Sequence, residues 1–231
     1  MENLVKEGER KEVLFAEKII LQSDAYYRFT SDAVALSRFA TVKAGDNVAD
    51  FCAGCGIVGL HAMCLNPRIA HLTLFELQQP LSDMSRRTAE INGDKDRVTA
   101  LCTPLQQVAD YNGAFDLILC NPPYFKLGDG EGKQTQSELL AKKEVAITLA
   151  EITQIASKKL RFGGRLAMCH IVERLTDVLT CMRAAKIEPK RLQFLARKEG
   201  GEPYLLLVEG VKGGKPGLKM LPTEVNRCST L

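Results

Sequence analysis

The chain has 231 residues, of which 45% are hydrophobic and 26% are charged, and its net charge is +3 at pH 7. A chain of this length and composition can bury one substantial core, so we expect a single globular domain rather than a disordered or fibrous protein. No apolar run approaches the roughly 20 residues of a membrane span, and the start lacks the basic and apolar profile of a signal peptide.

The first 40 residues are expected to form a lead-in that packs on the main domain, which spans residues 41–231. We expect a polar segment and then a short helix over residues 32–40, capped by Ser31 or Asp32.

Strands and helices alternate after the lead-in. Periodicity predicts strands over 48–51, 71–76, 97–101, 115–120, 165–171, 191–196 and 204–208, and helices over 57–65, 80–92, 137–160 and 174–186. This alternation indicates an α/β fold with a doubly wound, mostly parallel sheet. The last two strands have no helix between them, so we expect them to form an antiparallel hairpin at one edge of the sheet.

The first of these strands ends at Asp50 and leads into a glycine-rich loop. Gly54, Gly56 and Gly59 match the pattern G-x-G-x-x-G, and Glu76 follows Gly56 by 20 residues, at the end of the next strand. This pattern is also typical of dinucleotide-binding proteins, in which the acid binds a ribose hydroxyl. Asp50 favours S-adenosylmethionine (SAM), because a carboxylate attracts the ammonium group of SAM and would repel a pyrophosphate. A tight strand–helix turn without a cofactor is the simpler alternative.

Asn121-Pro122-Pro123-Tyr124 follows the apolar strand over 115–120. The amino nitrogen of adenine is a poor nucleophile because its lone pair is delocalised into the ring. The side-chain oxygen of Asn121 and the carbonyl of Pro122 could each accept one of its N–H groups and orient the lone pair toward a methyl donor. The prolines stiffen the turn, and Tyr124 could stack on the base. An ordinary strand-ending turn is the alternative.

Positive charge is concentrated in the C-terminal third. Residues 158–231 contain 15 Lys/Arg and 7 Asp/Glu, whereas residues 1–157 contain 16 and 21. This asymmetry favours a polyanionic partner, with Lys142 and Lys143 as further candidate phosphate contacts. A solvated lysine-rich surface is the alternative.

Eight cysteines are scattered through apparent core segments, which favours reduced thiols in the cytoplasm. Cys52 and Cys55 form a C-x-x-C pair. No second ligand pair accompanies them, so no metal site is expected.

With these motifs the chain resembles the class I SAM-dependent N6-adenine methyltransferases. It is most similar to those that modify the tRNA adenosine just 3′ of the anticodon (position 37) in a valine tRNA. The resemblance covers nearly the whole chain and is carried by residues 27–36, the glycine loop, 115–125, 173–175 and 208–214. It implies a class I methyltransferase fold, SAM as cofactor and tRNA as partner. It also implies that Phe29, Thr30 and Asp32 line the methionine end of the cofactor.

Two positions depart from the family pattern. Cys52 stands where class I methyltransferases usually have the first loop glycine, which tightens the space beside the methionine moiety. Cys102 and Thr103 stand where an acidic residue often meets the cofactor adenine, so the adenine contact stays unassigned.

Several other activities fit parts of this pattern. Glutamine-N5 methylation of a protein factor would present the same flat amide to the turn, but its enzymes carry a helical substrate domain before the glycine loop. Methylation of DNA adenine or of ribosomal guanine, hydride transfer, and non-catalytic RNA binding are further alternatives.

Overall fold

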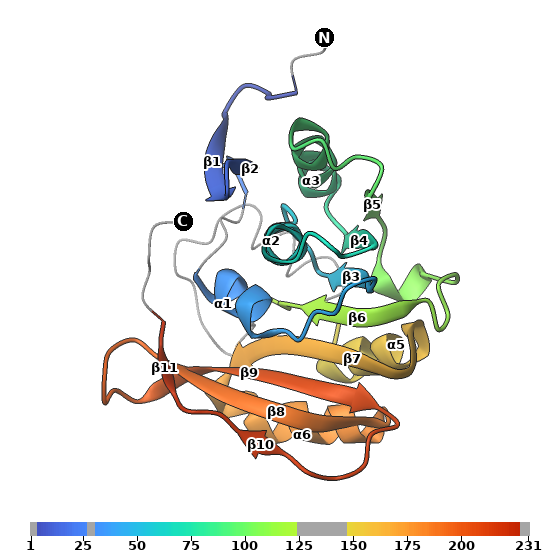
Figure 1. Cartoon of the computed structure of the whole chain (residues 1–231), viewed down its shortest axis with the longest axis vertical. Helices are drawn as coiled ribbons and strands as arrows, with labels where there is room; N and C mark the ends of the chain where they lie inside the picture. The colour runs from blue at the N-terminus through green and yellow to red at the C-terminus, as the bar shows by residue number, and fades with distance from the viewer. Residues whose placement is uncertain (1–3, 27–30, 124–146, 227–231) are drawn as a thin grey trace.

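A computed structural model of the chain describes residues 4–26, 31–123 and 147–226. Its centre is a nine-stranded sheet in the order β10-β8-β9-β7-β6-β3-β4-β5, with β11 also paired to β8 (Figure 1). The strands are β3 (Asn47–Phe51), β4 (His71–Glu76), β5 (Val98–Cys102), β6 (Phe115–Cys120), β7 (Leu160–Ile171), β8 (Ile187–Ala196), β9 (Pro203–Lys212), β10 (Lys219–Met220) and β11 (Glu224–Val225).

The part of the sheet from β7 to β5 is parallel, whereas β9 runs antiparallel to both β7 and β8. The expected mostly parallel sheet with an antiparallel hairpin near one edge is therefore confirmed. The short strands β10 and β11 add parallel pairing to β8 that the sequence did not indicate.

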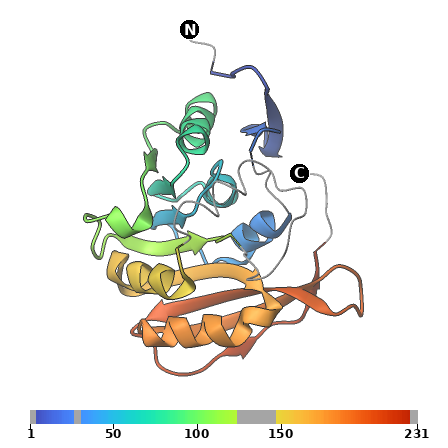
Figure 2. The ribbon, with the colours of Figure 1, turned by 180° about the vertical axis from the view of Figure 1, so that it is seen from behind.

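Helices cover both faces of the sheet (Figures 1 and 2). One face packs against α1 (Ser31–Phe39), α2 (Ile57–Leu65) and α3 (Gln79–Ile91), and the other against α5 (Leu149–Lys159) and α6 (Leu175–Ala184). Because side chains alternate along a strand, each strand contributes to both apolar cores. In β6, for example, Leu117 and Leu119 face α1 and α2, whereas Ile118 and Cys120 face the α5 and α6 side.

The lead-in is not simply a polar segment. It folds into the antiparallel hairpin β1 (Glu9–Phe15) and β2 (Lys18–Ser23), which buries Leu14, Ile20 and Leu21 in the core that also contains α2 and α3 residues. Two residues at the turn, Ala16 and Glu17, have φ values of 46° and 67°. Tight hairpins require such positive φ values and usually place Asn or Gly there, which explains why no residue pattern in this segment indicated a hairpin.

The expected helix over 137–160 is also corrected. In the described part of this segment the helix starts at Leu149, where the Thr148 hydroxyl and the Glu151 side chain form a reciprocal capping box. Residues 137–146 and the expected glycine-rich loop over 128–132 lie outside the described residues. None of the helices in the described ranges is long and apolar enough to cross a membrane.

Candidate active site

Four polar side chains project from the α1/α2 face of the sheet, at the carboxyl ends of neighbouring parallel strands. Asp50 lies near the end of β3, on the face opposite to Ala49 and Phe51. Glu76 ends β4, Asn121 follows β6, and Cys169 lies near the end of β7. Asn121 continues the face of Leu119, because it comes two residues later. Ligands of open α/β sheets bind outside this end of the strands, so the topology brings together residues distant in sequence.

The glycine loop fixes the carboxylate of Asp50. The backbone N–H of Gly59 donates to Asp50 Oδ2 over 2.8 Å. A Cβ atom on Gly59 would lie 2.9 Å from methyl groups of both Leu72 and Leu74, so only glycine allows α2 to approach the sheet this closely. At the start of α2, Gly56 has φ 88°, a conformation that glycine adopts without cost.

Asp50 is fully buried, and its Oδ1 atom has no hydrogen-bond partner among the described residues. Burial raises the pKa of Asp50 to about 7; the nearby charge of Glu76 acts in the same direction, and the Gly59 hydrogen bond opposes the rise. A buried carboxylate oxygen without a partner is costly. The site therefore fits a cationic group that would approach Asp50 from the strand ends.

Glu76 is held by the same loop. Its carboxylate accepts hydrogen bonds from the backbone N–H of Gly54 over 2.7 Å and of Gln78 over 2.9 Å. Burial raises the pKa of Glu76, and these backbone hydrogen bonds oppose that effect. Each carboxylate oxygen can accept a further hydrogen bond, so Glu76 fits a hydroxyl-bearing ligand.

Cys52 adopts a backbone conformation that favours glycine. Its φ is 59°, in the left-handed region where a side chain costs roughly 1–2 kcal/mol. The thiol lies beside that of Cys120, and this contact, together with burial, raises the pKa of Cys120 well above its usual value. All seven cysteines in the described part of the chain are free thiols.

The Asn121 turn has a partner that sequence analysis missed. The thiol of Cys169, which is fully buried, donates to Asn121 Oδ1 over 2.9 Å. Pro122 is buried and Pro123 is exposed, whereas Tyr124 lies outside the described residues. The amide of Asn121 is thus held against β7. No sequence pattern could have indicated this contact, because it depends on the register of β6 and β7, which pairs Cys120 with Met168.

The remaining candidate residues fall into three groups. Phe29, Thr30, Lys142 and Lys143 lie outside the described residues. Asp32 Oδ1 accepts from the Tyr204 hydroxyl over 2.7 Å and from Asn226 Nδ2 over 2.9 Å, so it links α1 to the C-terminal strands.

Cys102 ends β5 and Thr103 follows it. The exposed Cys102 thiol donates to Leu77 O over 3.3 Å, and Thr103 N donates to Glu76 O over 2.9 Å. Across the described residues, no group of three or more His, Cys, Asp or Glu could hold a metal ion.

Several of the basic C-terminal residues interact inside the protein: Arg165 is buried and pairs with Asp46, and Lys212 donates to Leu160 O over 2.7 Å. Lys159 and Arg191 are the two most fully occupied by hydrogen bonds to other segments. Lys159 is buried and donates to Ala109 O and Asn112 Oδ1 over 3.1 and 3.0 Å. Arg191 donates to Phe39 O and to Thr41 Oγ1 over 3.1 and 2.6 Å. Neither side chain is available to a polyanion in this arrangement.

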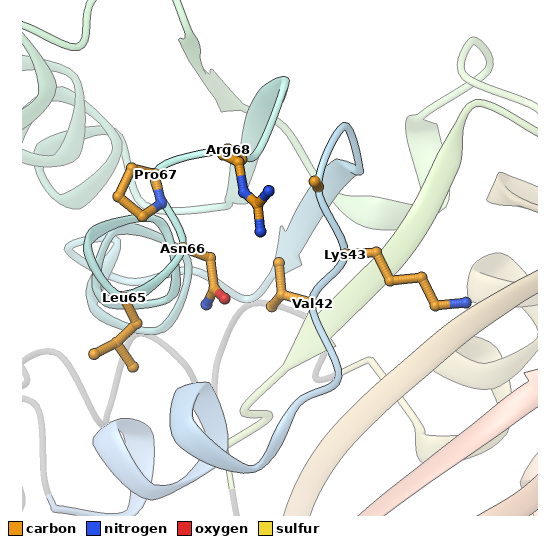
Figure 3. Close-up of a pocket in the computed structure, with 7 residues that line it drawn as sticks. Val42, Lys43, Leu65, Asn66, Pro67 and Arg68 are labelled. Carbon is orange, nitrogen blue, oxygen red and sulfur yellow. The ribbon is translucent and has the colours of Figure 1, made fainter.

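A small pocket lies at the opposite, amino end of β3 (Figure 3). It is lined by Val42, Lys43, Ala44, Leu65, Asn66, Pro67 and Arg68. Figure 3 shows Arg68 directed between the two lining segments and Lys43 directed away from them. The pocket does not include Asp50, Glu76 or Asn121 and is separate from the candidate site.

Comparison with known proteins identifies the family to which this fold and site belong. The model of the methyltransferase small domain family matches residues 31–174. The chain belongs to this methyltransferase family. The matched region runs from α1 through the last strand that contributes to the candidate site, so it contains Asp50, Glu76, Asn121 and Cys169.

Curated relatives of this methyltransferase share one name. The chain is 25% identical over 206 residues to the tRNA1(Val) (adenine(37)-N6)-methyltransferase of Shewanella sp. (strain MR-4), covering 85% of this chain and 78% of the relative. It is 31% identical over 162 residues to the protein of the same name from Shewanella sp. (strain W3-18-1), covering 69% and 66%.

Solved structures confirm the class I methyltransferase fold. A predicted O-methyltransferase from Agrobacterium tumefaciens superimposes with a TM-score of 0.66 at 17% identity, over 84% of this chain and 86% of that one. TYW2 from P. horikoshii, in complex with MeSAdo, gives a TM-score of 0.62 at 14% identity, over 90% and 73%.

Proposed function

We propose that this methyltransferase transfers a methyl group from SAM to the N6 amino group of an adenosine in tRNA, at position 37. The proposal depends on one observation: Asn121 and the Asp50 oxygen that lacks a partner among the described residues lie on one face of adjacent strands. Two relatives named for this reaction on tRNA1(Val) support the substrate.

The glycine loop would hold the cofactor. Asp50 Oδ1 would accept a hydrogen bond from the ammonium group, which neutralises the charge that burial disfavours. Glu76 would accept from the ribose hydroxyls. Cys52 would lie beside the methionine moiety, and the family resemblance implies that Phe29, Thr30 and Asp32 also line this end of the cofactor. Cys102 and Thr103, next to Glu76, would border the adenine.

Asn121 would position the reacting amino group. Its Oδ1 atom has two lone pairs, so it can accept from an adenine N–H while it keeps the thiol of Cys169. The Pro122 carbonyl would accept the second N–H, and Tyr124 would stack on the base. SAM would supply an electrophilic methyl group on its sulfonium sulfur, and S-adenosylhomocysteine, a neutral thioether, would be the leaving group. The chain's own residues then contribute alignment, which is sufficient for large rate enhancements.

The basic C-terminal third and Lys142–Lys143 would bind the RNA backbone in the cytoplasm. Anticodon loops suit such an enzyme because their bases are unpaired and can be turned out at modest cost. Lys212 lies at the amino end of the parallel strands, since its neighbour Val211 pairs with Arg165. Contacts there would reach RNA well beyond the reacting nucleotide.

The test uses total tRNA from cells that lack this protein. The tRNA is incubated with the purified protein and labelled SAM, and nucleosides are identified by mass spectrometry. N6-methyladenosine in a valine tRNA is the expected product. Labelled glutamine in a protein from the same extract, with every tRNA unlabelled, would replace the proposal with glutamine-N5 methylation.

A further inference from the structure

The loop between β8 and β9 lies at the same end of the sheet as the Asn121 turn. Figure 1 shows this loop beside β11 on the left, the side toward which β6 runs, and Figure 2 shows the same arrangement from behind. The loop begins at Arg197, directly after the last residue of β8, and leads into β9 at Pro203. Its residues therefore lie at the end of the sheet where the reacting base would enter.

Arg197 is held in a fixed position on this loop. Its guanidinium carbon lies 4.5 Å from the centroid of the Tyr204 ring. That ring is anchored through its hydroxyl, which donates to Asp32 Oδ1 over 2.7 Å and accepts from Asn226 Nδ2 over 2.6 Å. Stacking on an anchored ring orients a guanidinium before any ligand arrives, which reduces the entropy lost on binding.

The hydrogen-bonding edge of Arg197 has no acidic partner. Arg197 is exposed, and no carboxylate in the described part of the chain forms an ion pair with it. Glu199 and Glu202 share its loop and are exposed, so the loop is not a general basic patch. The feature that distinguishes it is one oriented arginine.

Arg191 provides a contrast within the same sheet. Its guanidinium also stacks on an aromatic ring, that of Phe39, at 4.6 Å. However, Arg191 donates to Phe39 O and Thr41 Oγ1 and forms an ion pair with Glu209. Arg191 therefore stabilises the fold, whereas the equivalent donors of Arg197 form no ion pair with any of the described residues.

Strand geometry gives the distance from Tyr204, on which Arg197 stacks, to Asn121. Leu207 of β9 pairs with Cys169, the partner of Asn121. Tyr204 lies three residues before Leu207. This places it about 10 Å along the strands and about 10 Å across two strand spacings, or roughly 14 Å from Asn121. A few nucleotides of RNA span that distance.

We propose that Arg197, stacked on Tyr204, binds a backbone phosphate of the RNA close to the target adenosine. The proposal rests on RNA being the substrate. A guanidinium with a free planar edge binds a phosphate through paired N–H donors. Because Tyr204 lies roughly 14 Å from Asn121, the phosphate bound by Arg197 would belong to a nucleotide near the target adenosine rather than to a distant part of the tRNA.

The experiment measures how binding of an anticodon stem–loop oligoribonucleotide by the full chain depends on salt. We expect Arg197→Gln to weaken binding about fivefold and to lower the log–log salt slope by about 0.7–0.9, the value for one phosphate contact. Arg197→Lys keeps the charge and should keep the wild-type slope. The affinity for S-adenosylhomocysteine should not change in either variant.

Arg68→Gln is the matched control, because it removes an exposed arginine at the amino end of the sheet. Its salt slope should equal that of the wild type. If Arg197→Gln also keeps the wild-type slope while the wild type methylates the RNA, the inference is wrong and the proposed function stands. If the wild type neither binds nor methylates any RNA, both are overturned.

Discussion

The buried carboxylate of Asp50 makes the affinity for SAM depend on pH. Burial raises the pKa of Asp50 to about 7 in the free protein. Binding of an ammonium group requires the ionised form of Asp50. Protonation of Asp50 therefore divides the apparent affinity by 1 + 10^(pKa − pH). Between pH 7.5 and pH 5.5 this weakens binding about 25-fold. Above roughly pH 8 the amino group of the ligand loses its own proton, so affinity should pass through a maximum near neutrality.

Isothermal titration calorimetry with S-adenosylhomocysteine, which has the same ammonium group, measures this profile. Titrations in two buffers of different ionisation enthalpy count the protons released. Near pH 6 we expect close to one proton per ligand. Asp50→Asn should bind more weakly at neutral pH, and its affinity should show no rise between pH 5.5 and 7. A wild-type affinity that stays constant over this interval would refute the pairing of Asp50 with the ammonium group.

The same carboxyl group affects folding in the free protein. Its pKa is raised from 3.8 in the unfolded chain to about 7 in the folded one, so the folded state binds the proton more tightly. The resulting stability is fully present below pH 4 and is lost as the pH rises to about 7, by an amount on the order of 4 kcal/mol. Urea unfolding of Asp50→Asn should lack this decline.

Three further outcomes test the site and its surroundings. Asn121→Ala should lower kcat by about 100-fold with little effect on SAM affinity; a wild-type rate would exclude its proposed role. Cys169→Ala should lower kcat by about two- to tenfold at unchanged KM, because a neutral hydrogen bond contributes about 0.5–1.5 kcal/mol, and Cys169→Ser should restore it. Equal rates for the two variants would show that the thiol only fills space. Replacing both Lys212 and Lys215 with glutamine should flatten the salt slope by about 0.7–0.9 per lost phosphate contact for full-length tRNA and not for the stem–loop; an unchanged slope would indicate a solvated surface.

Local patterns were sufficient to predict the central strands of the sheet and the glycine loop after β3. Alternating apolar segments indicated most of the strands, and the glycine pattern with Asp50 and Glu76 indicated the loop. These features depend on residues close in sequence, such as Gly59 and Asp50, whose contact closes a strand–helix turn. The β1–β2 hairpin could not be predicted in this way, because its turn uses Ala16 and Glu17 in a conformation that those residue types rarely adopt.

Contacts between distant segments explain why counting charges in the sequence could not identify which Lys and Arg residues are accessible to a polyanion. Counting Lys and Arg after residue 157 treats Lys159, Arg191 and Arg197 as equivalent. In the fold the buried Lys159 donates to Ala109 O and Asn112 Oδ1, Arg191 interacts with Thr41 and Glu209, and Arg197 is exposed and stacks on Tyr204. Their different roles follow from which strand each faces, and therefore from register rather than composition. A basic segment indicates a polyanionic partner, but only the pairing of β7, β8 and β9 identifies which of its cations could meet one near Asn121.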